Sequence, residues 1–248
     1  GSVSEENSVV ASPLQQRYQL DSGKGSSYVL QQTLRNPEEQ NSCCLTKIQL
    51  GDRKSLSTKD LAIATLIGSM ISEPAFDDLR TKQQLGYIVS AGVGVSMNVF
   101  ALSLLVQGAQ HTAQYYDESI EKFLRGFKHT VETMPSQQMD QFKASLESAL
   151  LRKDLSLMDR GVRFWDPIGK QLYDFQWNTE RVKALRSVSR EDVLNFYNEK
   201  VLDPATRRRL SVWLVSNNEN EKIGVDSPSF SQEIVGDIDT LRGKMSKF

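Results

Sequence analysis

The spacing of apolar residues changes several times along this chain, and the order of these changes restricts the fold more than any other feature. Residues 28–34 and 43–50 are strand-like runs separated by the turn sequence RNPEEQN, so they predict a strand pair. Residues 58–71 then carry apolar side chains at helical spacing, with Ser57 or Thr58 as the N-cap. The chain therefore combines sheet and helix in separate segments.

The rest of the chain continues in an irregular order. Two neighbouring strands are expected at 87–93 and 99–107, and two long amphipathic helices follow on either side of Pro135. A further helix begins at Ser189, and a last strand covers 209–215. Because strands and helices come in runs and do not alternate regularly, we predict an α+β fold, a mainly antiparallel sheet with helices packed on one face.

Composition and length favour an ordinary globular domain. The chain has 248 residues, of which 39% are hydrophobic and 25% charged, close to the averages for globular proteins. Its first residues are polar, and Gly1-Ser2 has the form of a tag scar. We predict a tag scar and flexible leader at 1–13 and a single α+β domain at 14–248.

The charge balance gives little reason to expect nucleic acid or a membrane as a partner. Thirty Lys and Arg residues face 31 Asp and Glu residues, and no stretch is apolar enough to span a bilayer. The one basic run, 207–209, is predicted to be a solvated strand entry and not a phosphate site. Cys43 and Cys44 are adjacent in a strand, where they point to opposite faces. Unbridged thiols favour the cytoplasm, with mitochondria or another organelle as the alternative.

Few residues of this chain carry obvious chemistry. Its two histidines, His111 and His129, do not form an H-x-x-E-H or H-E-x-x-H motif, so no metal site is predicted, and both side chains are expected to be solvated. Cys43 and Cys44 lie in an apolar strand, which argues against a cysteine nucleophile. No G-x-S-x-G motif is present either.

The stretch SEPAFDDLRTKQQLGYIVSAGV places an arginine and a tyrosine at a helix-to-strand junction. Ser72 is predicted to start a helix that Gly86 ends, after which a strand begins at once. This arrangement can bring Arg80 and Tyr87 to one rim of the sheet. Since 87–93 contains no charge to protect an exposed edge, we expect that strand to be interior.

Residues 71–89, ISEPAFDDLRTKQQLGYIV, resemble the signature of the C-terminal half of the insulinase (pitrilysin) family of inverted zincins, most closely its insulin-degrading branch. Weaker similarity extends over 181–215. The resemblance implies the last of four homologous α+β domains in a long zinc metalloendopeptidase, whose half-shells close around peptides. Zinc is then expected on another domain and not in this chain, and the expected partners are a peptide substrate and the other domains of the same enzyme.

The resemblance also implies roles for three residues. Arg80 and Tyr87 match the arginine and tyrosine that reach across the chamber toward the substrate, and Phe76 matches a residue that lines the side-chain pocket beside the scissile bond. An arginine fork can hold substrate carbonyls, and a tyrosine hydroxyl can donate to a developing oxyanion. Because the chain lacks H-x-x-E-H, it should be inactive on its own.

Two alternatives stay open at this level. Arg80 could pair with Asp77 or Asp78 while Phe76 and Tyr87 pack in the core, as residues with such spacing commonly do. The whole protein could instead be an inactive insulinase-fold scaffold or binding module. An H-x-x-E-H motif upstream in the same reading frame would favour the peptidase, and its absence would favour the scaffold.

Overall fold

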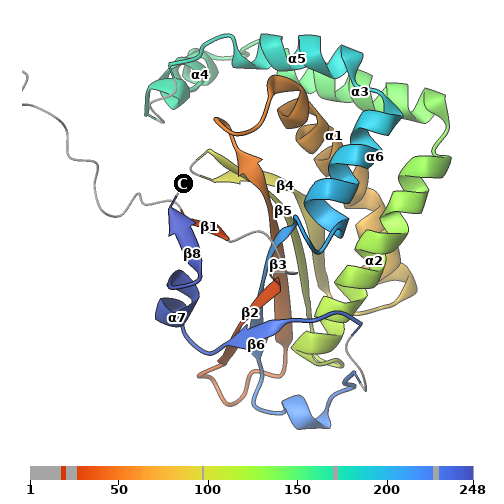
Figure 1. Ribbon diagram of the computed structural model, residues 1–248, viewed down its shortest axis with the longest axis vertical. Coiled ribbons are helices and arrows are strands. Elements are labelled where there is room, and N and C mark those ends of the chain that lie inside the picture. The colour runs from red at the N-terminus through yellow and green to blue at the C-terminus, as the bar shows by residue number, and fades with distance from the viewer. Residues whose placement is uncertain (1–17, 21–26, 97, 170–172, 226–228, 248) are drawn as a thin grey trace, which may run out of the picture.

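The computed structural model describes residues 18–20, 27–96, 98–169, 173–225 and 229–247 (Figure 1). The predicted leader at 1–13 lies outside these residues. No helix of the described residues is long and apolar enough to cross a membrane.

A six-stranded mixed sheet forms the centre of the molecule, with the strand order β4-β5-β3-β6-β2-β7. The pairs from β4 to β6 are antiparallel, whereas β2 runs parallel to both β6 and β7. A separate antiparallel pair joins β1 and β8. The strands are β1 (Tyr18–Leu20), β2 (Ser27–Thr33), β3 (Ser42–Asp52), β4 (Ile88–Ser96), β5 (Val99–Gly108), β6 (Arg208–Val215), β7 (Glu233–Val235) and β8 (Met245–Lys247).

Helices α1, α2 and α6 pack along one face of this sheet, α3, α5 and α4 continue over its upper end, and α7 and the β1–β8 pair lie on the other side (Figure 1). The helices are α1 (Thr58–Ala75), α2 (Ala113–Thr133), α3 (Ser136–Leu150), α4 (Leu157–Gly169), α5 (Trp177–Ser187), α6 (Arg190–Tyr197) and α7 (Ile238–Arg242). Two π-helical segments, η2 (Phe76–Lys82) and η3 (Asn198–Leu202), and a 3₁₀ turn, η4 (Glu219–Glu221), complete the set. The predicted α+β class is confirmed.

Side-chain alternation divides the apolar residues between the two faces of the sheet. In β2, Val29 belongs to the main core under α1 and α2, while its neighbour Leu30 packs in a small cluster with Val235 and Leu241. Neighbouring strand residues point to opposite faces, so this division follows from the period of two. The main core is continuous and buries nearly every apolar residue of α1.

Local sequence signals explain where several helices begin. Ser57 caps α1 and forms a capping box with Asp60, and Ser189 does the same for α6 with Asp192. Such caps satisfy backbone N–H groups that lack a partner in the first turn. The predicted helix starts at these positions are confirmed.

Three predictions about elements are wrong. Strands β2 and β3 are not paired, because β6 lies between them. The strand at 87–93 is not interior, because β4 is the outermost strand on its side of the sheet. Ser72 does not start a new helix, because α1 continues through Pro74 and passes directly into η2. A proline removes only one helical hydrogen bond, and here the bonding changes to the π type two residues later.

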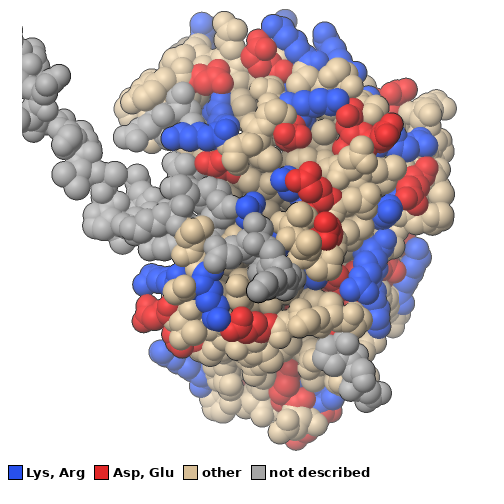
Figure 2. Space-filling view, viewed as in Figure 1, with Lys and Arg blue, Asp and Glu red and all other residues tan. Residues whose placement is uncertain are grey.

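Positive and negative side chains are interspersed over the face shown in Figure 2. This mixture matches the formal charge of −1.

Candidate functional site

The helix-to-strand junction is built by a π-helical turn that two leucines fix to the core. The backbone N–H of Gln83 donates to the carbonyl oxygen of Asp78, five residues earlier, at 2.9 Å. Leu79 and Leu85 are buried, and the Leu85 N–H donates to the Leu79 carbonyl at 3.0 Å. Gln84 turns the chain with a φ of 53°. Short π-helical segments of this kind occur frequently at functional sites.

Gly86 is required for close backbone packing and not for ending the helix, as the sequence had suggested. A Cβ atom at this position would lie 2.0 Å from the carbonyl oxygen of Gln107 on β5. Gly108 faces it, and a Cβ there would lie 2.5 Å from the Leu85 carbonyl oxygen and 2.6 Å from the Tyr116 hydroxyl. The two glycines let the junction lie directly against β5, which fixes the direction in which the next residue leaves the sheet.

Phe76, Arg80 and Tyr87 come together at this junction. The Arg80 Cζ atom lies 4.8 Å from the centre of the Phe76 ring and 5.2 Å from the centre of the Tyr87 ring. Both distances are within the range of cation–π attraction, which contributes about 0.5–1 kcal/mol at exposed sites. We call these three residues the junction cluster.

The packing alternative is wrong for the junction cluster. Tyr87 is 82% exposed and Phe76 is 43% exposed, so neither ring belongs to the core. Asp77 pairs with Lys82 at 2.8 Å, and Asp78 accepts a hydrogen bond from Gln83. Arg80 has no ion pair with any described residue, and its guanidinium is held by the two rings.

The cluster offers two kinds of polar group to a ligand. The Arg80 guanidinium carries several N–H donors in a planar fork, which suits carbonyl or carboxylate oxygens. The Tyr87 hydroxyl has no hydrogen-bond partner among the described residues, whereas a buried tyrosine usually has one. Both donors lie next to the apolar surface of the aromatic rings, so a peptide could bind with its backbone on the donors and a side chain on the rings.

The sequence did not reveal a buried ionic network between α2 and the sheet. Arg207 and Arg209 were expected to be solvated, but both are buried. Arg209 Nη2 lies 2.5 Å from Asp117 Oδ1, and Arg207 Nη1 lies 2.9 Å from Glu121 Oε1. The available signal was an Asp and a Glu four residues apart on α2, facing two arginines two residues apart at the start of β6, Arg207 just before the strand and Arg209 within it.

Asp117 is the centre of this network. Burial alone would raise its pKa, but the charge of Arg209 and the hydrogen bonds that it accepts outweigh burial and lower the pKa. Besides Arg209, its hydrogen-bond donors are Thr46, Ser211, Trp213 and Gln232. With its acceptor capacity filled in this way, Asp117 fixes α2 to the sheet and is not placed to act on a ligand.

The remaining candidate residues for chemistry occupy structural positions. Cys43 and Cys44 are free thiols in β3, and burial raises the pKa of both. His129 is exposed, as expected, but His111 is buried against Tyr115, and burial lowers its pKa. His111 was expected to be solvated, but the rings of Tyr115 and Tyr116 lie 4.3 Å and 5.9 Å from its own and cover it. Within the described ranges, no group of three His, Cys, Asp or Glu side chains is placed to hold a metal ion.

Comparisons with known proteins agree with this architecture. The family described as "PQQ synthase PqqF-like, C-terminal lobe domain 4" matches residues 66–165, which include the junction cluster. The insulin-degrading enzyme of Drosophila melanogaster is 30% identical over 198 residues, covering 79% of this chain and 19% of that protein. The chain thus spans about a fifth of the length of this relative.

Solved structures share the fold. Pitrilysin superposes with a TM-score of 0.74 at 14% identity, over 94% of this chain and 24% of its own. A peptidase M16 inactive domain from Pseudomonas fluorescens superposes with a TM-score of 0.54 at 13% identity, over 85% of this chain and 45% of its own. The fold and the matched sequence therefore define a domain of the C-terminal lobe type found in these peptidase-related proteins. The chain is therefore similar in sequence to the insulin-degrading enzyme and to this C-terminal lobe family, and it shares the fold of pitrilysin.

Proposed function

We propose that this chain is the non-catalytic C-terminal domain of a zinc metalloendopeptidase that degrades peptides in a closed chamber. In this proposal, the junction cluster binds the peptide and stabilises the transition state at a zinc site on another domain. The described residues offer no zinc ligand set, so the contribution of this chain is binding and orientation.

The exposed position of Tyr87 is the observation that carries this proposal. A phenol that is 82% exposed, without a hydrogen-bond partner among the described residues, contributes little to folding. Its hydroxyl is free to donate to a carbonyl oxygen that becomes negatively charged when the peptide bond is attacked. One such donor is worth about 3 kcal/mol in the transition state.

Arg80 is suited to hold the peptide before and during the reaction. Its fork can donate two hydrogen bonds to peptide carbonyls, and the contacts with Phe76 and Tyr87 limit its rotamers in advance. A side chain ordered before binding loses less entropy when the ligand arrives. Phe76, which is partly exposed beside Arg80, supplies an apolar wall for a substrate side chain.

The test is steady-state kinetics of the full-length protein on a short quenched peptide. Tyr87→Phe is expected to lower kcat about 100-fold with little change in KM, because its hydroxyl acts mainly on charge present in the transition state. Arg80→Ala is expected to lower kcat and raise KM, because the guanidinium engages the substrate in both states.

Tyr173→Phe provides a matched control, since Tyr173 is also an exposed tyrosine but lies outside the junction cluster. It should retain the parental kinetics, and melting curves should show that each variant is folded. Turnover by Tyr87→Phe at the parental rate would remove the catalytic assignment. A full-length protein without H-x-x-E-H and without peptidase activity would instead support the scaffold alternative.

A further inference from the structure

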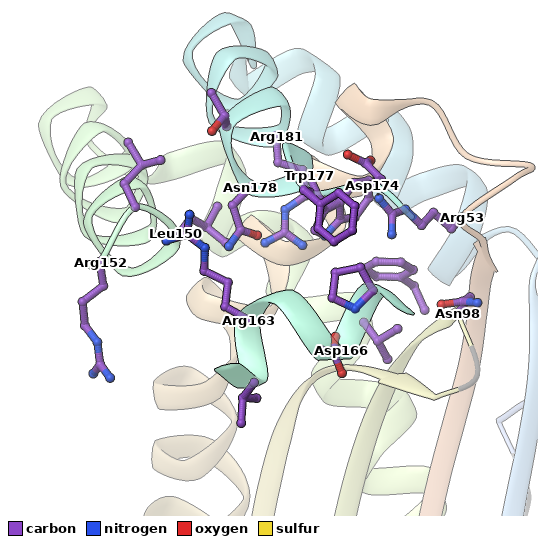
Figure 3. Close-up of a pocket in the computed structure, with 17 residues that line it drawn as sticks. Arg53, Asn98, Leu150, Arg152, Arg163, Asp166, Asp174, Trp177, Asn178 and Arg181 are labelled. Atoms are coloured by element: carbon purple, nitrogen blue, oxygen red, sulfur yellow. Dashed lines mark hydrogen bonds and ion pairs between the residues drawn. The ribbon is translucent and has the colours of Figure 1, made fainter. Parts of the chain in front are cut away.

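A pocket of about 530 Å³ lies far from the junction cluster, where the turn between β4 and β5 meets α3, α4 and α5. Its wall combines apolar and charged side chains (Figure 3). The apolar part includes Val95, Phe100, Leu150, Val162, Pro167 and Phe175. A pocket of this size and mixture can hold a small organic molecule.

Arg181 is the unusual residue of this pocket. It projects from α5 beside two buried apolar residues, Val182 and Leu185, and only 8% of its surface is exposed. It has no carboxylate partner and no hydrogen bond in the described structure, and its Nε atom is buried without an acceptor. An unpaired buried charge is strongly unfavourable, and an anionic ligand on Arg181 would offset that cost.

A second positive charge near Arg181 makes the binding of an anion more favourable there. Its guanidinium lies 5.1 Å from the centre of the Trp177 ring, and that of Arg53 lies 3.6 Å from the same centre. Figure 3 shows the two arginine side chains on either side of this ring. Burial, together with the charge of Arg53, lowers the pKa of Arg181 to about 10, so the group is still charged at neutral pH.

The other charges near Arg181 favour a ligand with one negative group, because the carboxylates of Asp166 and Asp174 also line the pocket and the side chain of Arg152 points away from Arg181 (Figure 3). Arg53 pairs with Asp174 at 2.5 Å, and Arg163 pairs with Asp154 at 3.1 Å. These arginines already have carboxylate partners, whereas Arg181 has none. A ligand with several negative charges would lie close to the carboxylate of Asp174, which disfavours a polyphosphate.

We propose that this pocket binds a molecule with one carboxylate and an apolar body, with the carboxylate on Arg181 and the apolar body against Trp177 and the apolar wall. A carboxylate matches the planar fork of a guanidinium with two parallel hydrogen bonds. The ligand could be a free organic acid or the C-terminus of a peptide, because both present the same group. This inference does not depend on the proposed peptidase role.

Two-dimensional NMR of the 15N-labelled chain can test the pocket, since the indole N–H of Trp177 is one of only three in the sequence. Trp177→Phe assigns the signal. The probes are 3-phenylpropionate, a dipeptide ending in phenylalanine, the C-terminal amide of the same dipeptide, and inorganic triphosphate. We expect saturable shifts with the acids, a dissociation constant on the order of 1 mM, and binding at least about 10-fold weaker with the amide.

Two arginine variants on α5 provide the matched comparison. Arg181→Gln should weaken binding of the acids at least about 10-fold, and Arg181→Lys should weaken it less, because it keeps the charge but not the fork. Arg186→Gln should bind like the parent, since Arg186 lies on the surface and pairs with Glu147. Melting curves show that each variant is folded.

Equal binding of the acids and the amide would overturn the proposal, as would unchanged affinity in Arg181→Gln or tighter binding of triphosphate than of the acids. If only 3-phenylpropionate binds, the ligand is a free acid. If the dipeptide binds more tightly, the ligand is a peptide C-terminus.

Discussion

At the scale of single residues, Gly86 decides whether the junction cluster can form. Gly86→Ala would place a methyl group 2.0 Å from a backbone carbonyl oxygen that has little freedom to move. We expect the free energy of unfolding to fall by about 3 kcal/mol and the position of Tyr87 to change. Urea unfolding measures the first effect, and the chemical shifts of the Tyr87 ring measure the second.

Gly92→Ala is the control for this experiment, because a Cβ there would meet no atom within 4 Å. Its effect should stay within about 1 kcal/mol. Equal stability of the two variants would contradict the close packing of Gly86 against β5.

Asp117 makes a different contribution, which depends on pH. Asp117→Asn leaves Arg209 buried without its closest charge partner and should lower the free energy of unfolding by about 3–5 kcal/mol at neutral pH. The folded state lowers the pKa of Asp117 below its ordinary value of 3.8, so its stabilisation is present above that value and is lost as the pH falls toward the lower pKa.

The difference in the free energy of unfolding between Asp117→Asn and the parent should therefore become smaller below about pH 4. Urea unfolding at a series of pH values measures this difference. Asp140→Asn, at an exposed position on α3, serves as the control and should follow the parent at every pH. A constant difference in the free energy of unfolding down to about pH 2 would show that the charge of Asp117 does not stabilise the fold.

The sequence predicted the junction cluster better than it predicted the buried ionic network around Asp117. The motif around Arg80 and Tyr87 indicated that they meet at one rim, and the family resemblance added Phe76, so the structure adds only the cation–π contacts of Arg80 with the two rings. The burial of Arg207 and Arg209 was missed, because a run of three arginines has the composition of a solvated segment. Its partners lie on α2, about ninety residues earlier, and only the folded chain brings them together.

At the scale of elements, patterns of period and capping identified most helices and strands but not their neighbours. The alternation of apolar residues reports which face of a strand is buried, and it carries no information on how many strands flank it. For that reason β4 was expected inside the sheet although it forms an edge, and β2 was expected beside β3 although β6 separates them. Neighbour order depends on contacts between distant segments.

The edge position of β4 predicts a specific pattern of amide exchange. In β4, only the N–H groups directed toward β5 are hydrogen-bonded within the sheet, so alternate amides should exchange quickly. In β3, which pairs with both β5 and β6, nearly all amides should exchange slowly. Hydrogen exchange followed by NMR on the isolated chain makes this comparison, and equal protection along both strands would reveal a second partner on β4.

At the scale of the whole molecule, β4 connects two separate sites. The junction cluster lies just before its first residue, Ile88, and the Arg181 pocket includes Val95 near its other end. Nine residues of extended strand span about 30 Å, so one small ligand does not reach both sites. The two proposals can therefore be tested independently in the same chain.

Under the proposed function, this chain without the rest of the full-length protein should fold but lack peptidase activity. It should unfold cooperatively, because its main core is continuous. It should not hydrolyse peptides, because its two histidines form no zinc motif and the junction cluster supplies only binding groups.

The measurement is hydrolysis of a quenched peptide with and without a zinc chelator, with the full-length protein as the positive control. Tyr87→Phe should leave the chain's background signal unchanged, since a contaminating peptidase is indifferent to that substitution. Chelator-sensitive hydrolysis that disappears in Tyr87→Phe would mean that the chain assembles an active site by itself, and the proposed dependence on another domain would be wrong.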